Sequence, residues 1–238
     1  MELIGHRGCA AQFPENTCYA VREASRRLSA VEIDVRRCGS GELVAFHDET
    51  LERVTDATGR LAEVSLTELQ RLEVFDSGEP VPRLETVLET VPSDVTLQVE
   101  LKERGLAADV GSLLDRTGVD ARLSSFQVDV LEEARAVDPD RPLGYLFRTD
   151  ADRALSVASE LDCTHLHPHY DCCLETDVVA TAQGRGLEVV AWRAARTVEH
   201  VRALHGVGVD GVTADRYDIL PARLEADLTP AASALSED

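Results

Sequence analysis

Short apolar runs alternate with amphipathic segments along most of this chain of 238 residues. From about residue 95 onward, each run has the length of a buried strand, and the segment after it has apolar side chains at helical spacing. With two earlier runs, the alternation predicts eight β/α units, the number that closes a parallel TIM (β/α)8 barrel. An open doubly wound sheet is the alternative. The predicted strands are residues 3–7, 31–36, 95–101, 122–126, 143–147, 164–167, 188–192 and 209–213.

The segments between these strands carry signals of helix starts. Residues 14–17 precede an amphipathic segment that reaches about Leu28, and we expect Asn16 to cap this helix. Ser65 and Glu68 have the spacing of a capping box, which predicts a short helix at that point. The other predicted helices are residues 83–91, 105–117, 127–137, 150–161, 174–185, 196–205 and 216–226.

The chain leaves the β/α alternation after its second strand. Residues 43–47 form another apolar run only about six residues after residues 31–36, whereas a parallel neighbour needs a crossover of about a dozen residues. The run therefore returns antiparallel as a short ribbon, which brings His47 roughly opposite Ile33. Residues 49–82 have no strong period apart from the capping box, and we expect them to form a small insertion at this end of the barrel.

Acidic residues dominate the charge, with 44 Asp and Glu against 24 Lys and Arg and a net charge of −20. This balance argues against nucleic acids and anionic membranes as non-specific partners. Lys102 is the only lysine, and an acidic, almost lysine-free composition predicts a halophilic protein. We expect a single barrel domain over residues 1–226 and a loose tail over residues 227–238.

Neither membrane insertion nor secretion is indicated by the apolar segments. The sequence has no run of about 18 uncharged apolar residues, and its start lacks the pattern of a signal peptide, so we expect a cytoplasmic protein. The six cysteines include no C-x-x-C pair, so reduced thiols are expected rather than disulfides or a zinc site. Cys9 is interpreted as a small packing residue.

Polar side chains gather where the first three predicted strands end. Side chains alternate along a strand, so acids two residues apart share one face. The carboxyl ends of barrel strands also meet at one rim, where active sites of such barrels lie. The residues predicted to meet at this rim are His6, Arg7, Glu32, Asp34, His47, Glu100 and Lys102.

These residue types predict a metal site beside a phosphate site. The three carboxylates would repel one another and raise one another's pKa values unless a cation lay among them. Ligands that are all oxygen favour Mg²⁺ or Ca²⁺ over zinc. Arg7 and Lys102 would add a site for an anion, for which phosphate is the best fit. His6 and His47 could supply the acid and the base of an in-line displacement, so the set predicts metal-assisted cleavage of a phosphate ester.

The same residues belong to a series of short motifs that runs in order from the first strand to about Asp215. The motifs are His6-Arg7-Gly8, Pro14-Glu15-Asn16-Thr17, Glu32-x-Asp34-Val35, His47-Asp48, Pro82-x-Leu84-Glu85, Glu100-Leu101-Lys102, Ser125-Phe126 and Gly208-Val209-Asp210-Gly211-Val212-Thr213. As a set they are specific, and by them the chain resembles the glycerophosphodiester phosphodiesterase family.

This resemblance implies a TIM barrel that hydrolyses a small-molecule glycerophosphodiester to an alcohol and glycerol phosphate. It implies a divalent ion held by three acids, and it makes the two histidines the acid/base pair. We assign His47 as the base and His6 as the acid that serves the leaving group. Residues 49–82 correspond to the insertion that partly covers the site in that family. The metal ligands implied in this way are Glu32, Asp34 and Glu100.

The chain departs from the family pattern after its seventh strand. The family usually shows Trp-Thr-Val-Asn there, whereas Trp192 is followed here by Arg193-Ala194-Ala195. We interpret Trp192 as a hydrophobic wall for the glycerol moiety. Because no proline follows Asp215 closely, that acid is expected to be structural. For His167 and His169, a solvent-facing loop is favoured over a place at the mouth of the site.

Two other functions are compatible with such a barrel. A phospholipase-like enzyme or a lyase would cleave another phosphodiester, but it would need an apolar lip or a basic rim that residues 49–82 do not provide. A barrel that binds phosphorylated polyols without turnover would have lost an acid/base or metal residue, and all of them are present. Attack by water and attack by a substrate hydroxyl, through a cyclic phosphate, both remain open.

Overall fold

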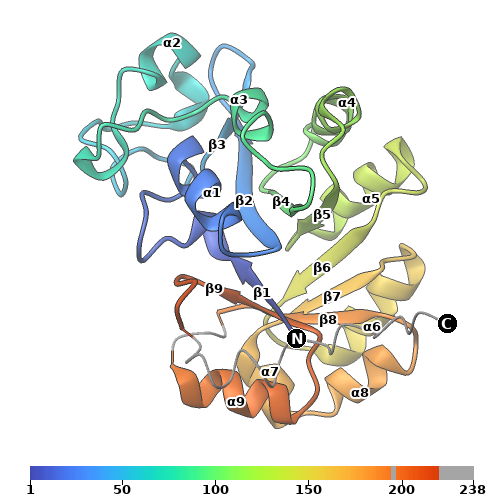
Figure 1. The fold of residues 1–238 in the computed structure, drawn as a ribbon. Helices are drawn as coiled ribbons and strands as arrows, with labels where there is room; N and C mark the ends of the chain where they lie inside the picture. The colour runs from blue at the N-terminus through green and yellow to red at the C-terminus, as the bar shows by residue number, and fades with distance from the viewer. Residues whose placement is uncertain (194–196, 220–238) are drawn as a thin grey trace, which may run out of the picture.

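The computed structural model describes residues 1–193 and 197–219, which form a closed parallel barrel surrounded by helices (Figure 1). Each barrel strand pairs in parallel with its two neighbours, and β1 closes the ring by pairing with both β9 and β2. The TIM barrel predicted from the sequence is confirmed, and the open sheet is wrong. The barrel strands are β1 (Glu2–Gly5), β2 (Ala30–Arg37), β4 (Thr96–Leu101), β5 (Ala121–Ser125), β6 (Leu143–Phe147), β7 (His165–Pro168), β8 (Glu188–Ala191) and β9 (Gly211–Ala214).

The helices lie outside the barrel and follow the predicted order. They are α1 (Cys18–Ser25), α3 (Leu84–Leu88), α4 (Ala107–Thr117), α5 (Val128–Val137), α6 (Ala151–Glu160), α7 (Tyr170–Glu175), α8 (Val178–Gln183) and α9 (Val198–Gly206). The cap of α1 is Thr17, whose hydroxyl accepts from the backbone N–H of Ala20, so the prediction that Asn16 caps this helix is wrong.

The single helix predicted over residues 174–185 is divided into α7 and α8 at Thr176. The Thr176 hydroxyl donates to the carbonyl of Cys172 and accepts from the backbone N–H of Val178, and its backbone is extended. Threonine hydroxyls that bond to nearby backbone groups compete with helix continuation, which explains the break. Of the helix predicted over residues 216–226, only residues 216–219 are described, and they are not helical. The predicted domain boundary and tail lie outside the described residues.

The strand β2 has an apolar face toward the helices and a polar face toward the inside of the barrel. Val31, Ile33 and Val35 are fully buried in the main core between barrel and helices. The alternate residues Glu32 and Asp34 point into the barrel, as the period of two requires. The register with β4 places Glu32 beside Gln98 and Asp34 beside Glu100, so the acids of both strands meet at one level of the barrel.

The predicted ribbon is present as β3 (Leu43–Ala45), which pairs antiparallel with the end of β2. The insertion that follows contains η2 (Leu61–Glu63), α2 (Leu66–Leu69) with the predicted capping box, and η3 (Val74–Asp76). In Figure 1 it stands on the side of β3 and α1. It has a small core of its own, shared with the ribbon. That core consists of Cys38, Val44, Phe46, Leu51, Val54, Leu61, Leu69, Val74 and Val81.

Membrane-spanning potential and the state of the cysteines can also be read from the described residues. Among the described helices, none is both long and apolar enough to span a membrane. All six cysteines are free thiols, and Cys9 is fully buried beside Gly5. Burial raises the pKa of the Cys9 thiol to about 12, which suits the packing role expected from the sequence.

Candidate active site and metal centre

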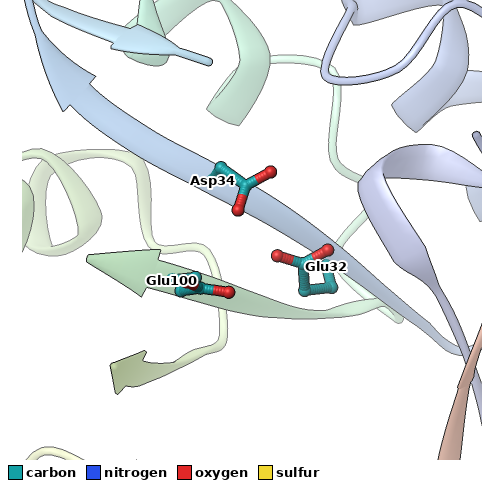
Figure 2. A group of neighbouring side chains, drawn as sticks. All are labelled: Glu32, Asp34 and Glu100. Atoms are coloured by element: carbon teal, nitrogen blue, oxygen red, sulfur yellow. The ribbon is translucent and has the colours of Figure 1, made fainter. Parts of the chain in front are cut away.

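Three buried carboxylates form the centre of the site. Figure 2 shows Glu32 and Asp34 on one face of β2 and Glu100 on the adjacent β4. Each of the three offers an oxygen atom, and these oxygens all lie within 4.8 Å of one another. Among the described residues, Oε1 of Glu32 has no hydrogen-bond partner although it is buried. A buried carboxylate oxygen without a donor is costly, so this trio has the charge and geometry of a cation site.

Asp34 is the acid of the trio that the protein itself neutralises. Its carboxylate lies 3.0 Å from Nε of Arg7 and 3.0 Å from Nζ of Lys102. The Asn16 amide donates to the Asp34 carboxylate over 2.9 Å, and its oxygen accepts from the Asp34 backbone N–H over 3.1 Å. Asn16 therefore holds an acid of the site rather than capping a helix. Lys102 also pairs with Glu100.

These neighbours give the acids opposite ionisation behaviour. Burial and the adjacent Asp34 charge raise the pKa of Glu32 to about 8. Burial and Asp34 also raise the pKa of Glu100, although Lys102 opposes the shift. Burial opposes the ionisation of Asp34 as well, but Lys102 and Arg7 hold its pKa well below its usual range. Without a cation, the trio thus favours one ionised acid beside two that resist ionisation.

A tight turn after β1 brings His6 and Arg7 to this centre. The turn η1 (His6–Gly8) has left-handed backbone at Arg7 (φ +50°) and at Gly8 (φ +76°). A Cβ on Gly8 would lie 2.7 Å from the Cβ of Ala20 in α1, so only glycine fits there. The backbone N–H of Arg7 donates to Glu32 over 2.9 Å, which fixes the turn against β2.

Each histidine of the site has its own carboxylate. Nδ1 of His47 lies 2.6 Å from Asp48, the next residue in the chain. Nδ1 of His6 lies 2.6 Å from Asp215, which follows β9. In a neutral imidazole, such a contact places the proton on Nδ1 and leaves Nε2 as the acceptor.

The two imidazoles differ in basicity. Burial lowers the pKa of His47 below its ordinary value. The charge of Asp34 opposes this shift, whereas the charges of Lys102 and Arg7 add to it. Burial also opposes the charged form of His6, but the hydrogen bond to Asp215 and the charge of Glu32 raise its pKa above the ordinary value. The surroundings of His47 therefore favour its uncharged form, and those of His6 favour its protonated form.

A cavity of about 560 Å³ opens over the centre. Its wall contains every residue predicted for the site except Asp34, whose side chain is only 1 % exposed beneath Arg7 and Lys102. One side of the wall is aromatic: Phe126 and Trp192 meet edge to face with ring centroids 5.1 Å apart. The indole N–H of Trp192 donates to the carbonyl of Phe147, so this wall is held in place.

The structure places several residues differently from the sequence interpretation. His167 and His169 are 0 % and 4 % exposed, so the solvent-facing loop favoured for them is wrong. His167 lies inside the barrel against Gly144, and His169 packs on Trp192 with ring centroids 4.7 Å apart. Neither lines the cavity. Both face inward because they follow the strand period through β7 past Pro168, where the sequence suggested an exposed turn.

Other residues of the site were missed or given another role from the sequence. Asp215 lines the cavity and bonds to His6, against the expectation of a structural acid. A signal for it existed, because it lies two residues after Thr213 and so shares its inward face. Glu15 lies in the cavity wall and accepts from Arg7 over 3.1 Å. Among the described residues that line this cavity, none lies between 49 and 82.

A TIM barrel whose cavity joins a carboxylate trio to two imidazoles, each held by a carboxylate of its own, is the arrangement of a barrel enzyme that cleaves phosphate esters. Residues 6–219 match the model of the glycerophosphoryl diester phosphodiesterase family, and the chain belongs to this family. It is accordingly a phosphodiester hydrolase, and the resemblance seen in the sequence is confirmed.

Similar proteins extend along nearly the whole chain. The glycerophosphodiester phosphodiesterase of Caldanaerobacter subterraneus subsp. tengcongensis is 27 % identical over 234 residues, which cover 92 % of this chain and 95 % of that protein. An Oleispira antarctica phosphodiesterase, solved with the product sn-glycerol-3-phosphate, is 28 % identical with a TM-score of 0.80, covering 90 % of this chain and 93 % of that one. The structure of the Thermotoga maritima glycerophosphodiester phosphodiesterase is 25 % identical in sequence with a TM-score of 0.81. The match covers 96 % of this chain and 98 % of that one.

Proposed function

We propose that this protein hydrolyses glycerophosphodiesters to an alcohol and glycerol phosphate, with His47 as general base and His6 as general acid. The observation that carries the proposal is that one cavity holds two imidazoles, each bonded through Nδ1 to a carboxylate of its own, beside the carboxylate trio. The directions in which the pKa values of His6 and His47 are shifted agree with these roles. A base must be uncharged and an acid must be protonated at the working pH. His47 would take the proton from the attacking oxygen, and His6 would give one to the oxygen that leaves phosphorus.

Both routes of attack can use the same acid and base. When water attacks, a P–O bond forms to water, the P–O bond to the alcohol breaks, and the alcohol leaves with the proton from His6. When a glycerol hydroxyl attacks, the first product is a cyclic phosphate, which water opens in a second displacement. In that second step His6 and His47 exchange roles, because each has changed its protonation state.

A divalent ion, Mg²⁺ or Ca²⁺, fits Glu32, Asp34 and Glu100. The support is the buried Oε1 of Glu32 without a donor, the 4.8 Å spread of the ligand oxygens and the all-oxygen donor set. When bound, the ion would polarise a phosphoryl oxygen and offset its charge. Arg7 and Lys102 keep Asp34 ionised, and both line the cavity where the phosphoryl group would lie.

The aromatic wall suits the glycerol end of the substrate. Trp192 and Phe126 form an aromatic surface in the cavity wall. The C–H groups of a polyol can pack against such a surface. The Oleispira phosphodiesterase was solved with sn-glycerol-3-phosphate, which supports a glycerol phosphate as the product here. A cavity of about 560 Å³ has room for a small water-soluble diester.

Two alternatives have less support. A phospholipase-like or lyase reaction on another phosphodiester would favour an apolar surface around the mouth, whereas the exposed large apolar residue of the described cavity wall is Phe126. A barrel that only binds phosphorylated polyols has no use for two imidazoles held by separate carboxylates. Hydrolysis of a glycerophosphodiester uses every group of the site.

A panel assay tests the proposal. Glycerophosphocholine, glycerophosphoglycerol, glycerophosphoinositol and bis-p-nitrophenyl phosphate are offered to the wild type, with chelator and with Mg²⁺ or Ca²⁺ added back. We expect turnover of at least one glycerophosphodiester, loss of activity in chelator, and roughly a 10²- to 10⁴-fold loss in His47→Gln and in His6→Gln. Near-normal activity of His47→Gln on every substrate that the wild type cleaves would show that His47 is not the base.

A further inference from the structure

Arg53, a residue of the insertion, contacts two carboxylates that belong to the site. Its Nε donates to Oδ2 of Asp48, whose other oxygen holds Nδ1 of His47. Its two terminal nitrogens donate to the two oxygens of Glu15 over 2.8 and 2.6 Å. The guanidinium thus uses three of its donors at once, with one carboxylate bound in the bidentate way that only arginine provides.

The contact to Asp48 fixes the carboxylate that holds the proposed base. Asp48 is an acceptor between two donors, the imidazole on one oxygen and Arg53 on the other. A carboxylate bound on both oxygens has one orientation, so the imidazole of His47 has one orientation as well. Nδ1 of His47 is then the protonated nitrogen, and Nε2 remains free to accept a proton in the cavity.

The contact to Glu15 connects this arrangement to the metal centre. Glu15 is only 7 % exposed and also accepts from Arg7, whose Nε lies 3.0 Å from Asp34. An unbroken series of hydrogen bonds and ion pairs therefore runs from His47 through Asp48, Arg53, Glu15 and Arg7 to the carboxylate trio. Arg53 is the member of this series contributed by the insertion.

We propose that Arg53 is a positioning residue for catalysis, through which the insertion orients the Asp48–His47 pair over the metal centre. This inference rests on the proposed role of His47 as the base. It gives the insertion a function other than covering the cavity, whose described wall it does not enter. Replacement of Arg53 would leave Asp48 with one donor instead of two and would release the insertion from Glu15.

A purely structural role for Arg53 would have a different signature. If Arg53 only held the insertion in place, its replacement would lower thermal stability. Its effect on kcat would then be the same in the wild type and in a variant that already lacks the Asp48 charge. A positioning residue acts through Asp48, so its effect on kcat depends on that carboxylate. The side chain of Arg53 is 43 % exposed, so its removal opens no cavity in the core.

The test combines Arg53→Gln, Arg53→Lys, Asp48→Asn and the double variant Arg53→Gln/Asp48→Asn. Arg60→Gln is the matched control, because Arg60 lies in the same insertion and makes a single surface pair with Glu49 at 3.2 Å. For Arg53→Gln we expect a loss in kcat of roughly 10- to 100-fold with a smaller change in KM. Arg53→Lys should recover only part of the loss, since an ammonium cannot bind two carboxylates in this geometry. Arg60→Gln should match the wild type.

The double variant and a spectroscopic measurement decide the outcome. In the Asp48→Asn background, Arg53→Gln should cost much less than in the wild type. The tautomer of His47, read by NMR of ¹⁵N-histidine-labelled protein, should change from Nδ1–H in the wild type to a mixture in Arg53→Gln. An Arg53→Gln variant with wild-type kcat, or one with an unchanged His47 tautomer, would overturn the proposal. A wild type inactive on every diester would instead contradict the proposed function, and the tautomer would still test Arg53.

Discussion

Nδ1 of His6 lies 2.6 Å from Oδ1 of Asp215, although 209 positions separate the two residues in the sequence. The contact exists because β1 pairs with β9, with Gly5 beside Ala214, so that the residues following both strands meet at the same rim. The closure of the barrel therefore orients the proposed acid and, together with the charge of Glu32, raises its pKa.

Asp215→Asn should lower activity by roughly 10- to 100-fold and should narrow the pH range of activity. Asp215 favours the charged form of His6, so its loss lowers the pKa of His6, and the acid loses its proton at a lower pH. The alkaline limb of the kcat/KM profile should move to lower pH. Asp218→Asn, which alters an exposed pair with Arg216 nearby, is the control and should leave the profile unchanged. An alkaline limb that stays in place would remove Asp215 from the mechanism.

The metal-free protein should lose stability as pH rises from about 5 to about 8. Burial and Asp34 raise the pKa of Glu32 to about 8, so the folded state retains a proton that the unfolded chain, with the ordinary pKa of 4.5, has already lost. The free energy of unfolding therefore falls between these two pH values. Thermal melts in chelator should show this slope in the wild type and a weaker one in Glu32→Gln. Mg²⁺ or Ca²⁺ should raise the wild-type Tm most at the alkaline end, where the cation replaces the proton. An equal dependence of Tm on pH in the wild type and in Glu32→Gln would show that Glu32 is not the group that retains the proton.

Trp192→Ala should raise KM by about tenfold, which corresponds to about 1.4 kcal/mol of lost binding, with a smaller effect on kcat. The indole forms the aromatic wall with Phe126 and packs on His169, but it holds none of the acid or base groups. Trp192→Phe keeps a ring but removes the hydrogen bond to Phe147, so its KM should lie between those of the wild type and Trp192→Ala. Steady-state kinetics on the preferred diester checks the order of the three proteins. A large loss in kcat with KM unchanged would assign Trp192 another role.

Salt should stabilise the protein. With a net charge of −20, the folded chain repels itself, and added ions screen that repulsion. Melting temperatures should rise between about 0.1 M and about 1 M KCl, where the Debye length falls from roughly 10 to 3 Å. A Tm that falls over this range would contradict the halophilic interpretation of the composition.

The sequence predicted the carboxylate trio because its geometry follows from local rules. Glu32 and Asp34 share a face through the strand period, and Glu100 ends the next barrel strand in the same way. The ribbon that returns His47 was equally local, since the short link excludes a parallel crossover. These are the parts of the site for which the sequence and the structure agree.

The residues that the sequence did not assign depend on contacts between distant segments. Asp215 meets His6 only when the ring of strands is closed. Arg53 meets Glu15 only when the insertion has folded around its own core, and residues 49–82 have no period from which that fold can be derived. Asn16 has the character of a helix cap, and its pairing with Asp34 reflects a left-handed backbone at φ +59° that the sequence does not reveal.

The pairing of β1 with β9 makes the site depend on both ends of the barrel sequence. The three acids and the ribbon that carries His47 all precede residue 102, whereas the carboxylate that holds His6 follows β9. A deletion that removed β9 would spare every residue of the carboxylate trio, yet it would take away the carboxylate partner of His6 and the strand between β8 and β1.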